Sequence, residues 1–224
     1  MDTLVAATPS RGLVHSRTVE AVLAAVQAAP VRLVGWVFSH DLPIPACHEQ
    51  VCGLAVATGA ECVWLVEEDV VPPVDALGVM LQVMRESDAD GAFIDYPIGS
   101  GPTCNCAQVV NGTVIWCGTG CLLLRREALE RIPRPWFDNR NEVEVKVRGD
   151  QVTVREFPVA YTYGGQDIGF TLRAHAAGVK IAYVPPEVAF CQHLKVGAWG
   201  KPMSNYGSHQ IVALPYPERW HDAS

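Results

Sequence analysis

Hydrophobic residues fall into two kinds of segment that alternate along the first part of the chain. Short apolar runs of strand length, each ending at polar or turn residues, cover 4–7, 31–38, 63–66 and 91–96. Between them lie segments of helical length, the first with apolar residues at helical spacing, covering 16–28, 47–58 and 74–85. Strands that alternate with helices predict an α/β fold with a parallel, doubly wound sheet.

The order of elements becomes mixed in the second half. Residues 107–110 and 113–116 flank the turn Asn111-Gly112 and predict a β-hairpin. A further apolar segment at 118–124 leads into a short helix at 126–131. A last helix is expected to begin near Asp167 and to end at Gly178, with a strand after it.

Residues 142–148 and 151–157 alternate strictly between polar and apolar side chains around Gly149-Asp150. This pattern predicts a second hairpin, in which Val145 faces Val154, Val147 faces Val152 and Glu144 meets Arg155. We expect this hairpin to be exposed and to serve as a lid or a partner surface.

Length and composition favour one globular domain. The chain has 224 residues, of which 49% are hydrophobic, enough for a substantial core. The last thirty or so residues mix Gly, Pro, Trp and Tyr with little periodicity. We therefore expect a domain over 1–195 and a C-terminal loop or lid and tail over 196–224. No run of 18 apolar residues or secretion signal is present, which predicts a soluble, cytoplasmic protein without a membrane span.

The formal charge of −7 disfavours nucleic acid as a partner. A local basic patch remains open as an alternative, and its members would be Arg125, Arg126, Arg131 and Arg134.

The chain has eight cysteines, which we expect to stay reduced in a cytoplasmic protein. A two-residue turn at 111–112 would place Cys106 directly opposite Cys117. A zinc site made by Cys104, Cys106, Cys117 and Cys121 is an alternative, but their C-x-C and C-x3-C spacings differ from the usual knuckles. Small buried thiols are the favoured interpretation.

Three acids, Glu67, Glu68 and Asp69, directly follow the apolar run at 63–66. They should therefore lie at the carboxyl end of a buried parallel strand, the edge where open α/β sheets bind ligands. Clustered oxygen donors there suit a divalent cation with phosphate bound to it. The alternative is that these acids are solvated and merely end the strand, with Asp69 or Asp75 opening the next helix.

Two further features follow in a fixed order: the sequence Gly164-Gly165-Gln166-Asp167 at a helix start, and His193 beyond the next strand. This order resembles the nucleotide-sugar glycosyltransferases of the GT-A fold, especially the family-2-like and galactosyltransferase-like inverting enzymes. In that family a D-x-D-type motif ends a central strand, a G-G-E-D-type motif carries the acid that deprotonates the acceptor, and a downstream His often completes the metal site. Glu67 stands here for the first Asp of the first motif, and Gln166 for the usual Glu of the second.

The resemblance covers most of residues 3–195 and implies a GT-A, Rossmann-like fold with a mixed, mainly parallel sheet and helices on both faces. It also implies a metal-dependent inverting glycosyltransferase that moves a sugar from a nucleotide-diphosphate donor to a hydroxyl. Asp69 and His193 would hold the cation, for which oxygen and imidazole ligands favour Mn²⁺ over Mg²⁺. Asp167 would be the base, although helix capping is its ordinary role.

The remaining site residues are expectations for the two substrates. For the donor, a UDP- or GDP-sugar, the candidates are Thr8, Pro9, Arg11, Asp41, Glu67 and Glu68. Alternation along the strand suggests that Glu67 meets the ribose or a metal-bound water and that Glu68 points away. For the acceptor, the candidates are Gly164, Gly165, Trp136 and Trp199, the last within a glycine-flanked lid.

Two other functions stay open at this point. A sugar-phosphate nucleotidyltransferase would share the nucleotide-binding sheet, but residues 8–12 lack the glycine-rich, basic loop that such enzymes usually have. A non-catalytic nucleotide-sugar-binding module would keep the fold without turnover. The sequence does not decide the acceptor, which could include a modified DNA base, or the sugar, a retaining stereochemistry or the oligomeric state.

Overall fold

The structure is a computed structural model, and it describes residues 2–97, 106–138, 141–148, 151–158 and 165–194. In chain order the elements are β1 (Asp2–Thr8), α1 (Ser16–Ala28), β2 (Val31–Phe38), α2 (Ala46–Ala57), β3 (Cys62–Val66), β4 (Val70–Val71), α3 (Ala76–Ser87), β5 (Gly91–Ile94), β6 (Ala107–Val110), β7 (Thr113–Cys117), β8 (Cys121–Arg125), α4 (Arg126–Arg131), β9 (Asn141–Arg148), β10 (Gln151–Pro158), α5 (Gln166–Ala176), β11 (Ile181–Val184) and β12 (Gln192–His193).

An eight-stranded sheet organises the fold, in the order β2-β1-β3-β8-β5-β11-β7-β6. β1 is parallel to both β2 and β3, and β11 is parallel to β5. β8 lies antiparallel between β3 and β5, and β7 and β6 complete the far edge with antiparallel pairs. The predicted α/β class with a mixed sheet is thus confirmed, and the sheet is Rossmann-like in its β1-α1-β2 and β2-α2-β3 units. The expectation of a mainly parallel sheet is wrong, because the insertion of β8 and the β6–β7 hairpin make four of the seven strand pairings antiparallel.

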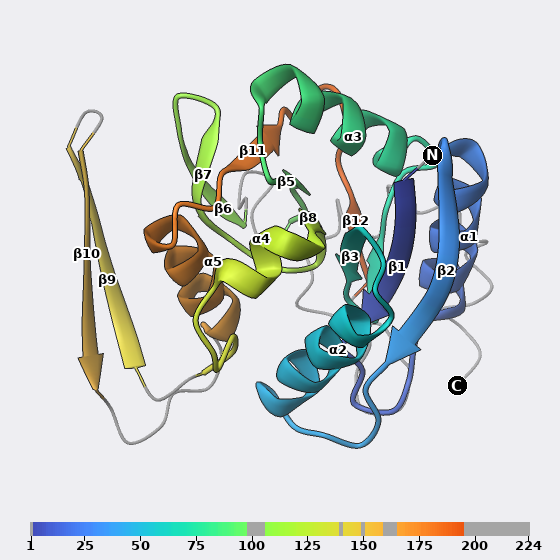
Figure 1. Ribbon diagram of the computed structural model, residues 1–224, viewed down its shortest axis with the longest axis horizontal. Helices are drawn as coiled ribbons and strands as arrows, with labels where there is room; N and C mark the ends of the chain where they lie inside the picture. Colours follow the sequence, from blue (N-terminus) through green and yellow to red (C-terminus); the bar gives the residue numbers. More distant parts are fainter. Residues whose placement is uncertain (1, 98–105, 139–140, 149–150, 159–164, 195–224) are drawn as a thin grey trace, which may run out of the picture.

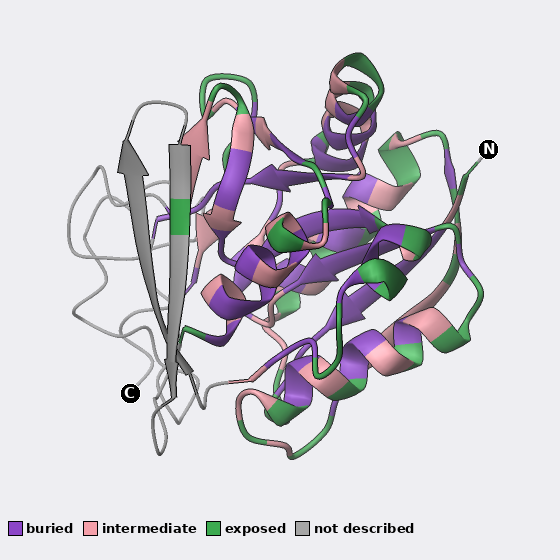
Figure 2. Cartoon of the chain, turned by 60° about the vertical axis from the view of Figure 1, so that its left-hand side comes forward, coloured by how far each residue is buried: buried purple, intermediate pink, exposed green. Residues whose placement is uncertain are grey.

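Helices cover both sides of this sheet (Figure 1). α2, α4 and α5 lie in front of the strands, whereas α1 lies behind β2. Every residue of β3 and β5 is buried, as expected for strands that are covered on both faces. Figure 2 shows this buried centre as a continuous layer, to which Trp64, Phe93 and Met80 contribute fully buried side chains.

Tyr96 fixes the relation between β5 and the start of β8. Its hydroxyl oxygen accepts a hydrogen bond from the Gly120 backbone N–H at 3.2 Å. A Cβ atom on Gly118 would lie 1.9 Å from the Tyr96 hydroxyl oxygen, and one on Gly120 would lie 2.6 Å from the Tyr96 ring. Both positions therefore need glycine because the tyrosine packs directly on their backbone.

The two predicted hairpins have different outcomes. In β9–β10 the predicted pairs are confirmed: Val145 faces Val154, Val147 faces Val152 and Glu144 faces Arg155. In β6–β7 the first two pairs, Val110 with Thr113 and Val109 with Val114, are as expected, but a bulge between Gln108 and Val109 shifts the rest by one residue.

The predicted pairing of Cys106 with Cys117 is consequently wrong, since Ala107 pairs with Cys117. Cys106, Cys117 and Cys121 are buried free thiols, in line with the favoured interpretation. No group of three or more His, Cys, Asp or Glu that could hold a metal occurs among the described residues, and Cys104 lies outside them. None of the helices in the described part of the chain is long and apolar enough to cross a bilayer.

We expect Gly118→Ala to lower the free energy of unfolding by about 1–3 kcal/mol, because the added methyl group would overlap the Tyr96 hydroxyl. Gly78→Ala is the matched control: no atom lies within 4 Å of its Cβ position, and alanine should stabilise α3 by about 0.5–1 kcal/mol. Urea unfolding of both variants measures the difference. Equal stabilities of the two variants would contradict this account of the Tyr96 contact.

Candidate functional site

The candidate site lies where β1, β3 and β5 end. The three carboxylates follow β3, and β12 returns to the same edge by pairing antiparallel with β4, with His193 opposite Val70. The Leu194 backbone N–H then donates to the Asp69 carbonyl oxygen at 2.7 Å. Backbone pairing, rather than side-chain attraction, therefore brings His193 to the acidic segment.

Asp69 and His193 face each other at this edge. The His193 Nε2 atom lies 3.4 Å from the Asp69 Oδ1 atom, and the Asp69 side chain is 12% exposed and that of His193 10%. On its other side, the His193 Nδ1–H donates to the Pro97 carbonyl oxygen at 2.9 Å. Burial alone would lower the pKa of His193, but the contact with Asp69 outweighs it and the pKa is raised.

The donor atoms of this pair suit a divalent cation. A carbonyl that accepts from Nδ1 fixes the tautomer and directs Nε2 to the metal in many protein sites. Two ligand atoms at about 2.1 Å from a cation and at right angles to each other are about 3.0 Å apart, close to the 3.4 Å found between Nε2 and Oδ1. Because no larger cluster occurs among the described residues, that part of the chain would supply these two ligands alone.

Glu67 points toward β8 and α2. Its Oε1 atom accepts a hydrogen bond from the Thr119 hydroxyl at 2.9 Å and lies 3.6 Å from the His48 Nε2 atom. The latter distance fits an ion pair but is too long for a hydrogen bond. Burial opposes ionisation of Glu67, but these partners and His193 outweigh it, so its pKa is lowered.

His48 is a member of the site that sequence reasoning missed. It is 3% exposed, its Nδ1 atom lies 3.2 Å from the Cys47 sulfur, and its ring packs 5.0 Å from that of Phe137. Burial would lower the pKa of His48, but Cys47 and Glu67 reverse the effect and raise it to about 9. The available signal was its spacing: His48 occupies the same inward stripe as three buried apolar residues of α2, Val51, Cys52 and Ala55.

Glu68 does not point away from the site, contrary to the expectation from strand alternation. Its carboxylate accepts from the Arg11 backbone N–H at 2.9 Å and from the Arg11 guanidinium at 2.6 and 3.0 Å. Strand geometry ends at Val66, so alternation no longer applies to the residues after it. Arg11, whose side chain is 55% exposed, is therefore held against the acidic segment.

The other donor candidates lie around the same loop. Thr8 and Pro9 are buried, and the Thr8 hydroxyl oxygen accepts from the Trp36 indole N–H at 2.9 Å. The loop is anchored to the end of β2, because the buried Ser39 hydroxyl accepts from the Ser10 backbone N–H at 2.8 Å. Asp41 is exposed and reaches this loop.

The position of Asp41 explains Gly12. A Cβ atom on Gly12 would lie 3.1 Å from the Asp41 Oδ1 atom, and Gly12 has a φ of +123°, which favours glycine. The loop after β1, which carries the exposed Arg11, thus lies next to the end of β2, which is followed by the exposed Asp41, as expected.

Asp167 lies in the first turn of α5, whose N-cap is Gly165 with a left-handed φ of 79°. Its Oδ1 atom accepts from the Ile168 backbone N–H at 2.9 Å. Thr171 fixes the helix to β7, since its hydroxyl oxygen accepts from the Cys117 backbone N–H at 3.0 Å. Burial, followed by the nearby charge of Glu67, raises the pKa of Asp167 to about 6.

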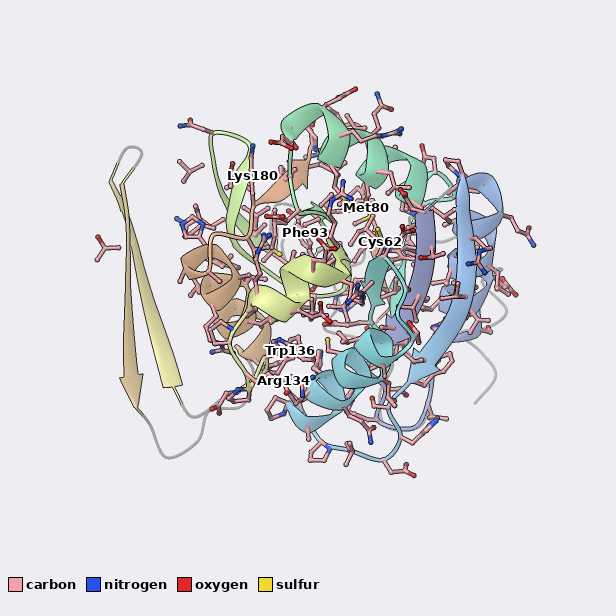
Figure 3. The ribbon with its side chains drawn as sticks, in the orientation of Figure 1. Cys62, Met80, Phe93, Arg134, Trp136 and Lys180 are labelled. Atoms are coloured by element: carbon pink, nitrogen blue, oxygen red, sulfur yellow. The ribbon has the colours of Figure 1, made fainter. Side chains whose placement is uncertain are left out.

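The acceptor candidates separate into different environments. Gly165 is exposed, and no atom lies within 4 Å of its Cβ position, so its conformation rather than crowding requires glycine. Trp136 is 2% exposed and donates through its indole N–H to the Ile132 carbonyl oxygen at 3.1 Å. Its side chain, with Arg134 packed on the ring, lies between α2 and α5 and presents no open face to an acceptor (Figure 3). Gly164 and Trp199 lie outside the described residues.

Comparison with known proteins gives a likeness of fold. No family model and no curated protein matches the chain. Among solved structures it is similar to A197 from STIV, with a TM-score of 0.57 and 17% sequence identity, over 87% of this chain and 86% of that one. Identity this low supports a shared fold and does not transfer a function.

The raised pKa of His48 predicts how stability depends on pH. A histidine whose folded pKa exceeds its unfolded value contributes stability that is complete below about pH 6.5 and is lost as the pH rises through about 9. We expect His48→Gln to flatten this decline and to cost on the order of 3 kcal/mol at pH 6.5, because Glu67 then lacks its buried partner.

The matched control for this prediction is the exposed residue His40, changed to Gln. Urea unfolding of wild type and both variants from pH 6 to 10 gives the slopes. His40→Gln should follow wild type, and a His48→Gln slope equal to that of wild type would show that the pair with Glu67 is not ionic.

Proposed function

We propose that this chain is a metal-dependent glycosyltransferase of the GT-A type, which transfers a sugar from a nucleotide-diphosphate donor to an acceptor hydroxyl with inversion. The main support is that Asp69 and His193 face each other after the end of β3 and that Glu67, in the same acidic segment, helps to raise the pKa of Asp167. The negative charge of Glu67 helps to raise the pKa of both His193 and Asp167, which supports a shared electrostatic environment for these groups. Solvated surface acids that merely ended a strand would not shift the pKa values of neighbouring groups in this way.

Asp69 and His193 would hold the cation. Their mixed oxygen and imidazole atoms suit Mn²⁺ at least as well as Mg²⁺. When bound, the cation would act as a Lewis acid that neutralises negative charge on the diphosphate leaving group. The Pro97 carbonyl holds the His193 ring, and the Leu194 N–H holds the backbone of Asp69, before any ligand arrives.

Asp167 would accept the proton of the acceptor hydroxyl. A general base is most effective when its pKa is close to the working pH, and the pKa of about 6 leaves Asp167 mainly ionised at pH 7 while keeping it more basic than an exposed aspartate. Its hydrogen bond with the Ile168 N–H uses Oδ1. The Oδ2 atom is the better placed of the two oxygens to receive a proton.

The loop after β1 would bind the nucleotide of a UDP- or GDP-sugar. Arg11 provides a positive side chain in this loop, next to the acidic segment. Glu68 orients the Arg11 guanidinium by accepting two hydrogen bonds from it. Asp41, at the end of β2, is available to a base or ribose edge. Thr8 and Pro9 would shape the loop from beneath, since both are buried.

Donor hydrolysis and transfer test the proposal. With Mn²⁺ and a panel of UDP- and GDP-sugars, wild type should release nucleoside diphosphate, and Asp167→Asn should lose on the order of 10²- to 10⁴-fold in transfer rate. The wild-type rate should fall as the pH drops below about 6, because Asp167 then retains its proton. Asp75→Asn, at an exposed acid before α3, is the control and should match wild type.

Two results would count against the enzyme. Absence of turnover with every donor tested would leave a binding module as the better explanation. Full transfer activity in Asp167→Asn would remove Asp167 from the role of base, even if the donor and metal requirements remained.

A further inference from the structure

A cavity of about 210 Å³ lies at the edge of the sheet opposite the candidate functional site. Its lining residues are Asp2, Cys62, Leu81, Met84, Arg85 and Arg125. Asp2 and Cys62 are the first residues of β1 and β3, and Arg125 is the last residue of β8, which runs antiparallel to β3. The candidate functional site follows the other end of β3, so the length of this strand separates the two places.

The helix α3 and the start of β3 form the apolar part of the cavity wall. Leu81, Met84 and Arg85 stand at positions i, i+3 and i+4 of α3, so they share one face of the helix. The side chains of Leu81, Met84 and Cys62 are buried. Burial raises the pKa of the Cys62 thiol to about 11, so this group is uncharged at pH 7. An apolar, uncharged wall of this kind suits a ligand with an apolar body.

Two guanidinium groups line the same cavity, those of Arg85 and Arg125. The Arg85 Nε–H donates to the Leu81 carbonyl oxygen of its own helix at 3.1 Å, a contact that does not use the two terminal nitrogens. Neither guanidinium forms an ion pair with an acid of the described residues. Both groups are therefore available to an anion that enters the cavity.

Two acids that lie close to Arg125 are engaged with other groups. The Arg125 backbone N–H donates to the Asp90 carbonyl oxygen at 2.8 Å, but the Asp90 carboxylate pairs with Arg131 at 2.7 Å. The Glu61 carboxylate accepts from the Thr3 backbone N–H at 2.7 Å and from the Thr3 hydroxyl at 3.0 Å. The positive charge of Arg125 is thus directed to the cavity and not to a fixed ion pair.

We propose that this cavity binds a small organic monocarboxylate, whose carboxylate contacts the two arginines and whose short apolar chain lies against Leu81 and Met84. Guanidinium groups bind carboxylates through paired hydrogen bonds. The lining carries two positive charges and the one negative charge of Asp2, which matches a ligand with a single negative charge better than a doubly charged phosphate ester. The volume lies below the roughly 300 Å³ at which pockets for drug-sized ligands begin, which selects a small ligand. The proposed glycosyltransferase function uses none of these residues, so the two proposals stand independently.

The methyl group of Met84 provides a local probe of this cavity. The chain has four methionines, so the full-length protein labelled with ¹³C in its methionine methyl groups gives a simple spectrum, in which the variant Met84→Leu identifies the Met84 signal. Hexanoate is the test ligand, and hexanamide, which has the same carbon chain without the charge, is its control. We expect hexanoate to shift the Met84 signal to saturation, with a dissociation constant on the order of millimolar, and hexanamide to leave the signal unchanged.

Charge variants locate the carboxylate. Arg85→Gln and Arg125→Gln should each weaken hexanoate binding about tenfold, because each removes a charged hydrogen-bond donor. Asp2→Asn should strengthen binding roughly two- to fivefold, because it removes a like charge from the lining. Arg11→Gln, at an exposed arginine near the opposite edge of the sheet, is the matched control and should bind as wild type does.

Three results would overturn the proposal. They are a Met84 signal that does not respond to hexanoate, an equal response to hexanamide, and an unchanged affinity for hexanoate in both Arg85→Gln and Arg125→Gln. Far-UV circular dichroism confirms that each variant is folded. Since both arginines are exposed and Met84 is used only to assign the signal, the comparison does not depend on a change in the core.

Discussion

The rest of the structure depends on the complete burial of β3. Because this strand is covered on both faces and lies between β1 and β8, its residues are apolar from Cys62 to Val66, and the chain can become polar only where the sheet ends. The three carboxylates therefore lie at the carboxyl edge of the sheet. The return of the chain through β12, paired with β4, then adds His193 at the same place. A single constraint, burial of a central strand, thus determines where the charged groups collect.

Charges at this edge act on one another because they are partly removed from water. His48 and Thr119 keep Glu67 ionised, and the resulting negative charge helps to raise the pKa of Asp167 to about 6. Asp69 stands at the other side and raises the pKa of His193. The division of labour among the acids follows from these partners: Glu67 is committed to the interior, Glu68 to Arg11, and Asp69 remains the acid that faces an imidazole at the edge.

Local patterns in the sequence predicted much of the fold, whereas contacts between residues far apart in the sequence were known only from the structure. The alternation in β9 and β10 fixed their register correctly because a two-residue turn leaves no other match for the valines. The antiparallel insertion of β8 was hidden, since a strand buried on both faces is a continuous apolar run in either direction. The bulge in β6, the contact of Glu68 with Arg11 and the pairing of His48 with Glu67 depend on tertiary packing, which spacing alone does not encode.

The central claim is that Asp69 and His193 form the protein part of a metal and diphosphate site. The most direct measurement is the number of Mn²⁺ ions bound per chain, obtained from the electron paramagnetic resonance signal of free Mn²⁺ in the presence of UDP or GDP. The account predicts one bound ion in wild type and in Glu127→Gln, an exposed acid on α4, and loss of that ion in both Asp69→Asn and His193→Gln. Binding that survives these two substitutions, or no binding by wild type with either nucleotide, would contradict it.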